Sequence, residues 1–287
     1  MLQLWLNSNT KERKIRRICE MQLMRFCQLF QDLPGEERMK LRTNYHIHTQ
    51  WSDGDNSVEE VVRTAEKVFD EIAITDHLVI KPDGSQEPYS IPAGRIKSYL
   101  KEIEKVEAQV RVLKGLEVDY FPESERIIEN LLKELDLDLV IGSVHFVDMA
   151  PIDLSEEFWI GKSQREVDEI YKKYYELVEM ASSSGLFDVI GHLDLPKKFG
   201  RRSDIFPENL DVEVVEINTS GLRYPAREIY PAEAICRKLV QKKVRFTIGT
   251  DAHSLNHLSY CIKEAEELLE RISGERVVFR HRAAVPI

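Results

Sequence analysis

The chain has 287 residues, of which 43% are hydrophobic and 31% charged, a balance typical of a soluble globular protein with a sizeable core. Its 40 basic and 50 acidic residues give a net charge of −10, which disfavours binding to nucleic acid or an anionic membrane by charge alone. No segment has the roughly 18 apolar residues of a transmembrane helix, and no signal peptide is evident. We therefore expect a cytoplasmic protein that does not bind membranes.

Residues 1–42 are predicted to form an N-terminal helical extension. A basic stretch at 11–17 precedes apolar residues that recur three and four positions apart, which is typical of an amphipathic helix. Leu33-Pro-Gly35 ends this pattern. Because the basic residues precede the apolar face and do not lie opposite it, a helix packed on the rest of the chain or on a partner subunit is favoured over a membrane-surface helix. A homo-oligomer is therefore left open.

From residue 43 to residue 287, short β-branched and apolar runs alternate with longer helical patterns. The predicted strands are Thr43–His48, Glu71–Thr75, Arg111–Val118, Leu137–Val144, Phe187–His192, Val212–Asn218 and Val244–Gly249. The predicted helices lie near 57–69, 92–109, 123–135, 163–184, 228–242 and 257–272. This alternation predicts a parallel α/β sheet that is buried on both faces. Seven such units favour one closed barrel over two domains.

Histidine and acidic residues gather where the predicted strands end. Six of the eight histidines fall there, and only His257 and His281 do not. The residues at or just after strand ends are His46, His48, Asp53, His77, Glu117, His145, His192, Asp251 and His253. The carboxyl ends of barrel strands converge on one face, so residues far apart in the sequence should meet in one pocket.

These nine residues have the chemistry of a metal centre. Imidazole and carboxylate ligands without any cysteine suit zinc, manganese or iron, whereas calcium and magnesium prefer shells of oxygen alone. Nine ligands are too many for one tetrahedral ion, but they suffice for two or three ions bridged by a carboxylate such as Glu117. Paired ions of this kind clamp a phosphate and activate a water. We expect a cofactor of two or three divalent metal ions.

The ordered motifs resemble those of a known group of metal enzymes. His46-x-His48, Thr75-Asp-His77, Glu117, His145, Gly191-His192 and Asp251-x-His253 are similar to the motifs of the polymerase and histidinol phosphatase (PHP) superfamily. The match extends from residue 43 to about residue 260. Segments 115–120, 141–146, 191–198 and 216–223 most resemble the histidinol-phosphate phosphatase branch. The resemblance implies a distorted seven-stranded (β/α)7 TIM-like barrel that holds up to three metals.

The resemblance also implies how the ligands are shared. The first metal would take His46, His48, Glu117 and Asp251, and the second would take Glu117, His145 and His192. The third would take Asp53, His77 and His253. Some relatives have a histidine where Asp53 stands in Trp51-Ser-Asp-Gly54, so the third site departs from their pattern.

A phosphate ester would need cations beyond the metals. Lys198 and Arg223 follow the fifth and sixth predicted strands on the same face, and we expect both to contact phosphate. Asp76 and Asp194 could orient ligand imidazoles, and Asp194 is also a candidate proton donor to the leaving group, with a metal-bound water as the nucleophile. Glu216 and Asn218 are expected to face the substrate. His257 is expected at the surface and His281 in an inert tail.

The sequence therefore predicts a metal-dependent phosphomonoesterase, and the resemblance implies L-histidinol phosphate as its substrate. The second hypothesis is another phosphoesterase of the superfamily, acting on nucleotides, oligonucleotides or phosphotyrosine. A third hypothesis, from a different class, is a metal-binding scaffold without activity. The retention of all nine candidate ligands disfavours the scaffold, and the acidic net charge disfavours a long nucleic acid as substrate.

Overall fold

The computed structural model describes residues 41–207 and 209–287, so the amphipathic helix predicted within 1–42 lies outside the described residues. The chain divides into two units, and the unit formed by Arg42–Pro286 contains every feature described below. Within the described part of the chain, no helix combines the length and the apolar character that a membrane span requires.

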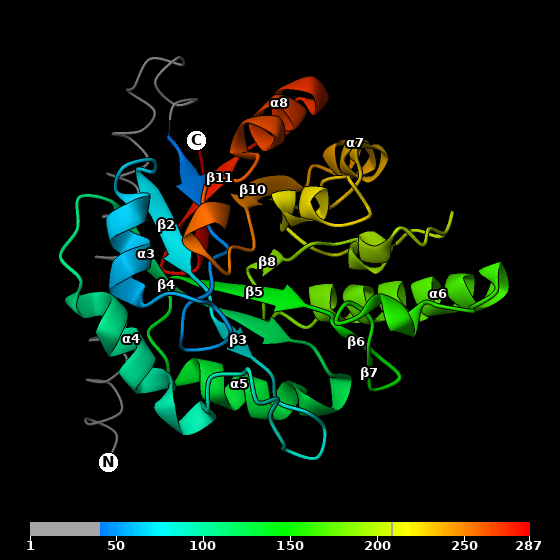
Figure 1. The fold of residues 1–287 in the computed structure, drawn as a ribbon, viewed down its shortest axis with the longest axis horizontal. Coiled ribbons are helices and arrows are strands. Elements are labelled where there is room, and N and C mark those ends of the chain that lie inside the picture. The colour runs from blue at the N-terminus through cyan, green and yellow to red at the C-terminus, as the bar shows by residue number, and fades with distance from the viewer. Residues whose placement is uncertain (1–40, 208) are drawn as a thin grey trace, which may run out of the picture. The chain divides into compact units, whose positions relative to one another are not determined.

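Seven parallel strands form a nearly closed barrel, which confirms the predicted fold class (Figure 1). In order around the sheet they are β1 (Thr43–Asn44), β2 (Glu71–Ile74), β4 (Arg111–Asp119), β5 (Leu139–Ser143), β8 (Val189–Ile190), β9 (Val214–Asn218) and β10 (Arg245–Gly249). The short β3 (His77–Leu78) pairs with the far half of β4. The barrel closes where Tyr45 N donates to Ile248 O at 2.9 Å and where Ile47 pairs with Ala252.

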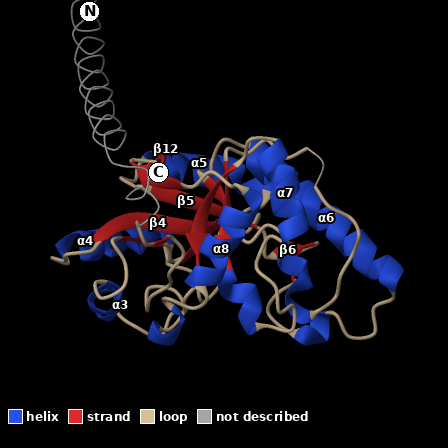
Figure 2. Cartoon of the chain, turned by 90° about the horizontal axis from the view of Figure 1, so that it is seen from above, coloured by secondary structure: helices blue, strands red, loops and turns tan. Residues whose placement is uncertain are grey.

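Helices surround the strands, with α3 and α4 on one side and α6 and α7 on the opposite side (Figure 2). The α-helices are α3 (Val58–Ala65), α4 (Ile96–Lys105), α5 (Glu125–Lys133), α6 (Gln164–Ser183), α7 (Glu233–Gln241) and α8 (Ile262–Ile272). Short 3-10 helices are η1 (Ala93–Arg95), η2 (Pro122–Ser124), η3 (Glu156–Phe158), η4 (Leu195–Phe199), η5 (Thr219–Arg223) and η6 (Leu255–His257). Capping boxes at Ser57 and Ser163 start α3 and α6 by satisfying free backbone N–H groups.

Two helices begin about five residues later than the sequence pattern predicts. Before α7, Tyr230 exchanges backbone hydrogen bonds with Asn218, at 2.6 and 2.9 Å, so this stretch extends the edge of β9 and cannot be helical. Before α8, Cys261 has a φ of +53°, which separates that helix from η6. Tertiary pairing and a left-handed residue therefore override the local helical pattern.

The sequence pattern also misses two hairpins. One joins β6 (Phe146–Val147) to β7 (Ala150–Pro151), and the other joins β11 (Val277–Arg280) to β12 (Ala283–Pro286). Both two-residue turns have positive φ at each central residue, but Asp148-Met149 and His281-Arg282 contain neither glycine nor asparagine. The usual sequence signal of such a turn is therefore absent.

Candidate metal centre

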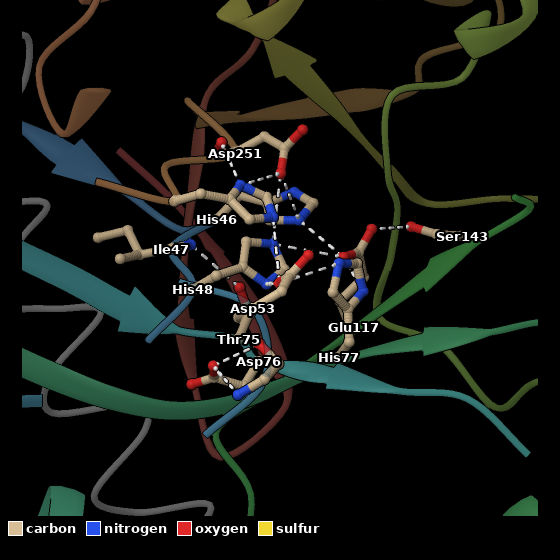
Figure 3. Close-up of polar contacts among 12 residues, drawn as sticks. His46, Ile47, His48, Asp53, Thr75, Asp76, His77, Glu117, Ser143 and Asp251 are labelled. Carbon is tan, nitrogen blue, oxygen red and sulfur yellow. Dashed lines mark hydrogen bonds and ion pairs between the residues drawn. The ribbon is translucent and has the colours of Figure 1, made fainter. Parts of the chain in front are cut away.

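The nine predicted ligand residues gather at the carboxyl ends of the barrel strands. Figure 3 shows the side chains of His46, His48, Asp53, His77, Glu117 and Asp251 converging on one point. The first two follow β1, and His48 is held by a hydrogen bond from its backbone N to Ala252 O at 2.9 Å. That bond places the start of the described barrel directly beside the segment that carries Asp251 and His253.

Glu117 is the centre of this cluster. It lies on β4 with 1% of its surface exposed. Its Oε2 atom is 3.2 Å from His46 Nε2, 3.5 Å from His48 Nε2 and 2.9 Å from His77 Nδ1. Its Oε1 atom is 2.9 Å from His192 Nε2 and 3.6 Å from His145 Nε2. One carboxylate thus faces five imidazoles, an arrangement that would allow it to bridge metal ions.

The potential ligand atoms form overlapping groups. Three groups have all their ligand atoms within 4.8 Å of one another. They are His46, His48 and Glu117; His77, Glu117 and His145; and His48, Asp53, His77 and His253. Because each ion takes ligands at about 2.0–2.2 Å, ligand atoms around one tetrahedral ion lie roughly 3.4 Å apart. The carboxylate–imidazole pairs within these groups, from 2.9 Å for Glu117 and His77 to 3.9 Å for Asp53 and His48, lie on either side of that spacing. The cluster can therefore hold several divalent ions.

The two aspartates complete the outer groups. Asp251 Oδ1 lies 3.3 Å from His48 Nε2 and 3.9 Å from His46 Nε2. Asp53 Oδ1 lies 3.2 Å from His253 Nε2 and 3.7 Å from His77 Nε2. The structure thus brings the carboxylate of Asp53 into the third group despite its departure from the histidine found in some relatives.

Several buried atoms of this cluster lack a hydrogen-bond partner among the described residues. They are His46 Nε2, both ring nitrogens of His48, His77 Nδ1, Glu117 Oε2 and His192 Nδ1. A buried polar atom without a partner costs about 1–3 kcal/mol, and several in one place would be strongly unfavourable. Metal ions supply the missing partners, so the residues present fit a multi-metal site.

The protonation states of the metal-free cluster differ from residue to residue. Burial lowers the pKa of His48 to about 3, and the charges of His253 and His77 act in the same direction, so this ring is neutral at neutral pH. Burial would also lower the pKa of the other candidate ligands His46, His77, His145 and His253, but neighbouring carboxylates raise it. Burial alone would raise the pKa of Glu117, but His46, His77 and His145 hold it well below its usual range, so the carboxylate is ionised. Metal binding would therefore displace protons from the rings whose pKa is raised.

Two carboxylates orient ligand rings from outside the cluster. Glu216 Oε1 accepts a hydrogen bond from His46 Nδ1 at 2.8 Å, and Asp119 Oδ1 accepts one from His145 Nδ1 at 3.0 Å. Each bond turns the opposite nitrogen toward Glu117. Glu216 was expected to face the substrate, which is wrong: it binds His46 in space that the absent side chain of Gly249 leaves. Asp119 was missed, although its position two residues after Glu117 on the same strand is a usable signal.

Asp76 supports the loop that carries Asp53 and does not orient an imidazole. Its carboxylate accepts hydrogen bonds from Thr49 N at 2.7 Å, Thr49 Oγ1 at 2.8 Å and Ser52 Oγ at 2.6 Å. The expectation that it binds a ligand ring is therefore corrected. By fixing residues 49–52, it sets the position from which Asp53 reaches His253.

Comparison with known proteins shows the family of this chain. The model of the PHP domain matches residues 44–220. The chain belongs to the PHP domain family. It is 36% identical over 228 residues to a probable histidinol-phosphatase of Deinococcus radiodurans, covering 75% of this chain and 86% of that one. It is 24% identical over 269 residues to a probable histidinol-phosphatase of Schizosaccharomyces pombe, covering 81% and 87%.

Two solved structures share the fold of this PHP domain. The putative histidinol phosphatase of Listeria monocytogenes aligns with a TM-score of 0.67 and 22% identity, over 78% of this chain and 99% of that one. The histidinol phosphate phosphatase of Lactococcus lactis, crystallised with zinc, L-histidinol and phosphate, aligns with a TM-score of 0.65 and 19% identity, over 85% and 98%.

A cavity of about 390 Å³ is lined by five of the candidate metal ligands: Asp53, His77, His145, Asp251 and His253. Lys198 lines it from η4, and its Nζ lies 3.1 Å from Asp153 Oδ2 and 4.5 Å from the centre of the Tyr224 ring. Burial would lower the pKa of Lys198, but Asp153 raises it above its usual value, so this lysine stays charged. Its place on the cavity wall supports the predicted phosphate contact.

Asp153 was missed by the sequence analysis because nothing in its local motif distinguishes it from a surface loop acid. Burial would raise its pKa, but Lys198 and His145 lower it, so the carboxylate is ionised. The cavity also contains a second ion pair, between Lys81 and Glu87.

Arg223 and Asn218 bind the protein and do not line the cavity in the described structure. The Arg223 guanidinium donates to Thr250 O and Asp251 O, both at 2.8 Å. Asn218 Nδ2 donates to Glu216 Oε2 at 2.9 Å. Arg223 therefore supports the main chain of the candidate ligand Asp251, and the expected contacts of Arg223 and Asn218 with the substrate stay predictions.

Asp194 is a buried structural acid. Its Oδ2 atom lies 2.7 Å from Lys197 Nζ and accepts a hydrogen bond from Ala232 N at 2.9 Å. Lys197 also donates to Glu228 and to Ile229 O, at 3.0 and 2.9 Å. Asp194 is 3% exposed and does not line the described cavity, and its role as a proton donor stays a prediction. The pair of Asp194 and Lys197 anchors η4, from which Lys198 reaches the cavity.

Proposed function

We propose that this protein hydrolyses L-histidinol phosphate to L-histidinol and phosphate. The observation that carries the proposal is the group of unpartnered, mutually close imidazole and carboxylate atoms around Glu117, beneath a cavity with a buried lysine. The 36% identical relative from Deinococcus radiodurans, which bears the name of this activity, supports the choice of substrate.

The nine ligand residues would hold two or three divalent ions. Zinc, manganese and iron accept this donor set, which contains imidazole and carboxylate groups but no sulfur. When bound, such ions polarise the phosphate and lower the pKa of a bound water. The overlap of the groups at Glu117, His48 and His77 means that loss of one ligand would disturb more than one ion.

The remaining residues of the chain would bind and orient the ester. Lys198 would offer its charge to the non-bridging phosphate oxygens, and its stabilisation grows as negative charge accumulates on them. Asp119 and Glu216 would keep His145 and His46 in the correct tautomer through their hydrogen bonds at 3.0 and 2.8 Å. Arg223 would fix the main chain of Asp251.

Phosphate release by the metal-loaded full-length chain tests this proposal. Histidinol phosphate, p-nitrophenyl phosphate, a nucleoside monophosphate, a short oligonucleotide and phosphotyrosine would be compared at equal metal loading. We expect kcat/KM for histidinol phosphate to exceed that for each of the others by at least about tenfold, or about 1.4 kcal/mol of transition-state binding. Equal rates would overturn the substrate assignment and favour the broader phosphoesterase hypothesis. Absence of any metal-dependent turnover would favour the scaffold.

A small phosphorylated molecule is accordingly the proposed partner. A cytoplasmic location, a homo-oligomer and the absence of nucleic acid binding stay predictions. Size-exclusion chromatography coupled to light scattering of the full-length chain would test the oligomeric state.

A further inference from the structure

Asp153 stands out because it places a negative charge in a cavity that must accept a phosphate. Among the described carboxylates that line this cavity, Asp53 belongs to one of the groups of potential metal ligands, Asp251 lies 3.3 Å from His48 Nε2, and Glu87 pairs with Lys81. Asp153 belongs to none of the metal groups. A carboxylate beside a phosphate repels it. A positively charged group elsewhere on the substrate would compensate for this repulsion.

The protein holds Asp153 firmly in place. The preceding residue, Ile152, is fully buried; its N donates to His145 O at 2.9 Å, and its own O accepts from Trp159 Nε1 at 2.8 Å. The carboxylate is thus presented from a segment fixed to the metal ligand His145. Its side chain is 19% exposed, so it can still meet a ligand in the cavity.

The two oxygens of this carboxylate have different surroundings. Oδ2 faces Lys198 Nζ at 3.1 Å, and the side chain makes no other hydrogen bond within the part of the chain that the structure describes. Oδ1 is therefore available to a second cation. A fixed carboxylate with one free oxygen, adjacent to the lysine proposed to bind phosphate, can accept a positively charged group located close to the ester.

We propose that Asp153 is a specificity-determining residue that binds an ammonium group next to the phosphate ester of the substrate. The inference rests on the proposed function, because L-histidinol phosphate carries its amino group on the carbon adjacent to the one that bears the ester oxygen. An ammonium in that position lies beside the phosphate, as Asp153 lies beside Lys198. Substrates without this charge would leave Oδ1 of Asp153 without a partner beside the phosphate, which disfavours them.

The test compares one substrate that carries this charge with one that lacks it. L-Histidinol phosphate and its deamino analogue, in which a hydrogen replaces the ammonium group, would be assayed with metal-loaded wild-type enzyme and Asp153→Asn. For wild type we expect kcat/KM to favour the amine by about 10- to 100-fold, the range of one charge-assisted hydrogen bond. In Asp153→Asn this ratio should fall to within about threefold of unity, through a higher KM for the amine.

Two further variants separate this role from others. Glu87→Gln changes the other non-ligand carboxylate of the cavity and should leave the ratio unchanged, whereas Lys198→Met should lower kcat/KM for both esters equally. Metal content and thermal denaturation would show that each variant is folded and loaded. An unchanged ratio of kcat/KM in Asp153→Asn, whether both esters lose activity equally or neither does, would overturn the inference.

The remaining outcome concerns a proton-donor role. p-Nitrophenyl phosphate has a good leaving group that needs no proton, so a donor variant would spare it and impair both histidinol esters. That result from Asp153→Asn would also overturn the inference. The proposed function is judged separately, from the wild-type preference for histidinol phosphate over p-nitrophenyl phosphate, so either proposal can fail while the other stands.

Discussion

Asp119 Oδ1 lies 3.0 Å from Nδ1 of His145, and this hydrogen bond turns His145 Nε2 toward the central carboxylate of Glu117. Asp119 and Glu117 are two residues apart on β4, so their side chains leave the same face of the strand. One strand therefore supplies both a metal ligand and the group that orients another ligand.

Asp119→Ala should weaken metal binding. The change leaves His145 free to adopt the wrong tautomer or ring orientation, and losses of about 10- to 100-fold in metal affinity or activity are typical for such partners of a ligand. Elemental analysis after dialysis against graded concentrations of a chelator would measure it. Asp136→Ala, at a position whose side chain is 81% exposed, is the matched control. Unchanged metal retention in Asp119→Ala would contradict the role.

Glu117→Gln should have a larger effect than Asp119→Ala. It removes a charge that faces five imidazoles and belongs to two of the three groups of potential ligands. We expect loss of more than one ion per chain, and activity reduced by more than the about 100-fold typical of an orienting residue. Metal stoichiometry and phosphate release would be measured on the same sample. A variant that kept its full complement of ions would refute the bridging role.

Lys198→Met should lower kcat/KM for every phosphate ester by about 10- to 100-fold, the effect of losing one charge-assisted hydrogen bond to a phosphate oxygen. Methionine retains much of the apolar stem that packs near Tyr224. Steady-state kinetics would measure the loss, with Lys133→Met, at an exposed position on α5, as control. If only KM rose while kcat was unchanged, the lysine would bind substrate and transition state equally.

Removal of metal should abolish activity and destabilise the fold. A ligand bound at about 1,000 times its Kd adds about 4 kcal/mol to the free energy of unfolding, and the buried imidazoles around Glu117 lose their partners without it. Thermal denaturation before and after chelation, with zinc, manganese or iron added back, would show this. An apoprotein with an unchanged Tm would mean that the cluster is stable without ions.

Asp194→Asn should affect stability more than chemistry. It leaves Lys197 buried with one fewer countercharge, and breaking a buried pair costs about 3–5 kcal/mol, of which Glu228 offsets part. Denaturant unfolding would measure the loss, and Asp194→Leu combined with Lys197→Met should recover some of it. Turnover per folded molecule should fall only modestly. A large fall in kcat at unchanged stability would instead support the hypothesis that Asp194 is the proton donor.

The barrel and its ligand cluster were predictable because both depend on strand order. Strands that end in histidine or acid must converge once the sheet is parallel and closed, so His46 and Asp251 could be paired without a structure. The roles of Glu216, Asn218, Arg223 and Asp194 were not predictable in this way. Each lies near the end of the barrel that carries the candidate ligands. Hydrogen bonds to neighbouring elements determine whether such a side chain lines the cavity or binds other parts of the protein.

Asp153 illustrates a second limit. It follows an irregular hairpin whose turn residues, Asp148 and Met149, carry no sequence signal for positive φ. Because the sequence did not predict that hairpin, it did not predict where the chain runs after β5. The position of Asp153 at the cavity therefore became known only from the structure.

The closure of the barrel between β1 and β10 has a consequence for the assembly of the metal centre during translation. His46 and His48 are translated early, whereas Asp251 and His253 emerge near the end, and the bond from His48 N to Ala252 O joins the two segments. A nascent chain that stops before Ala252 lacks one wall of the metal centre. The complete metal centre can therefore form only after β10, the last strand of the barrel, and the segment that follows it have been translated.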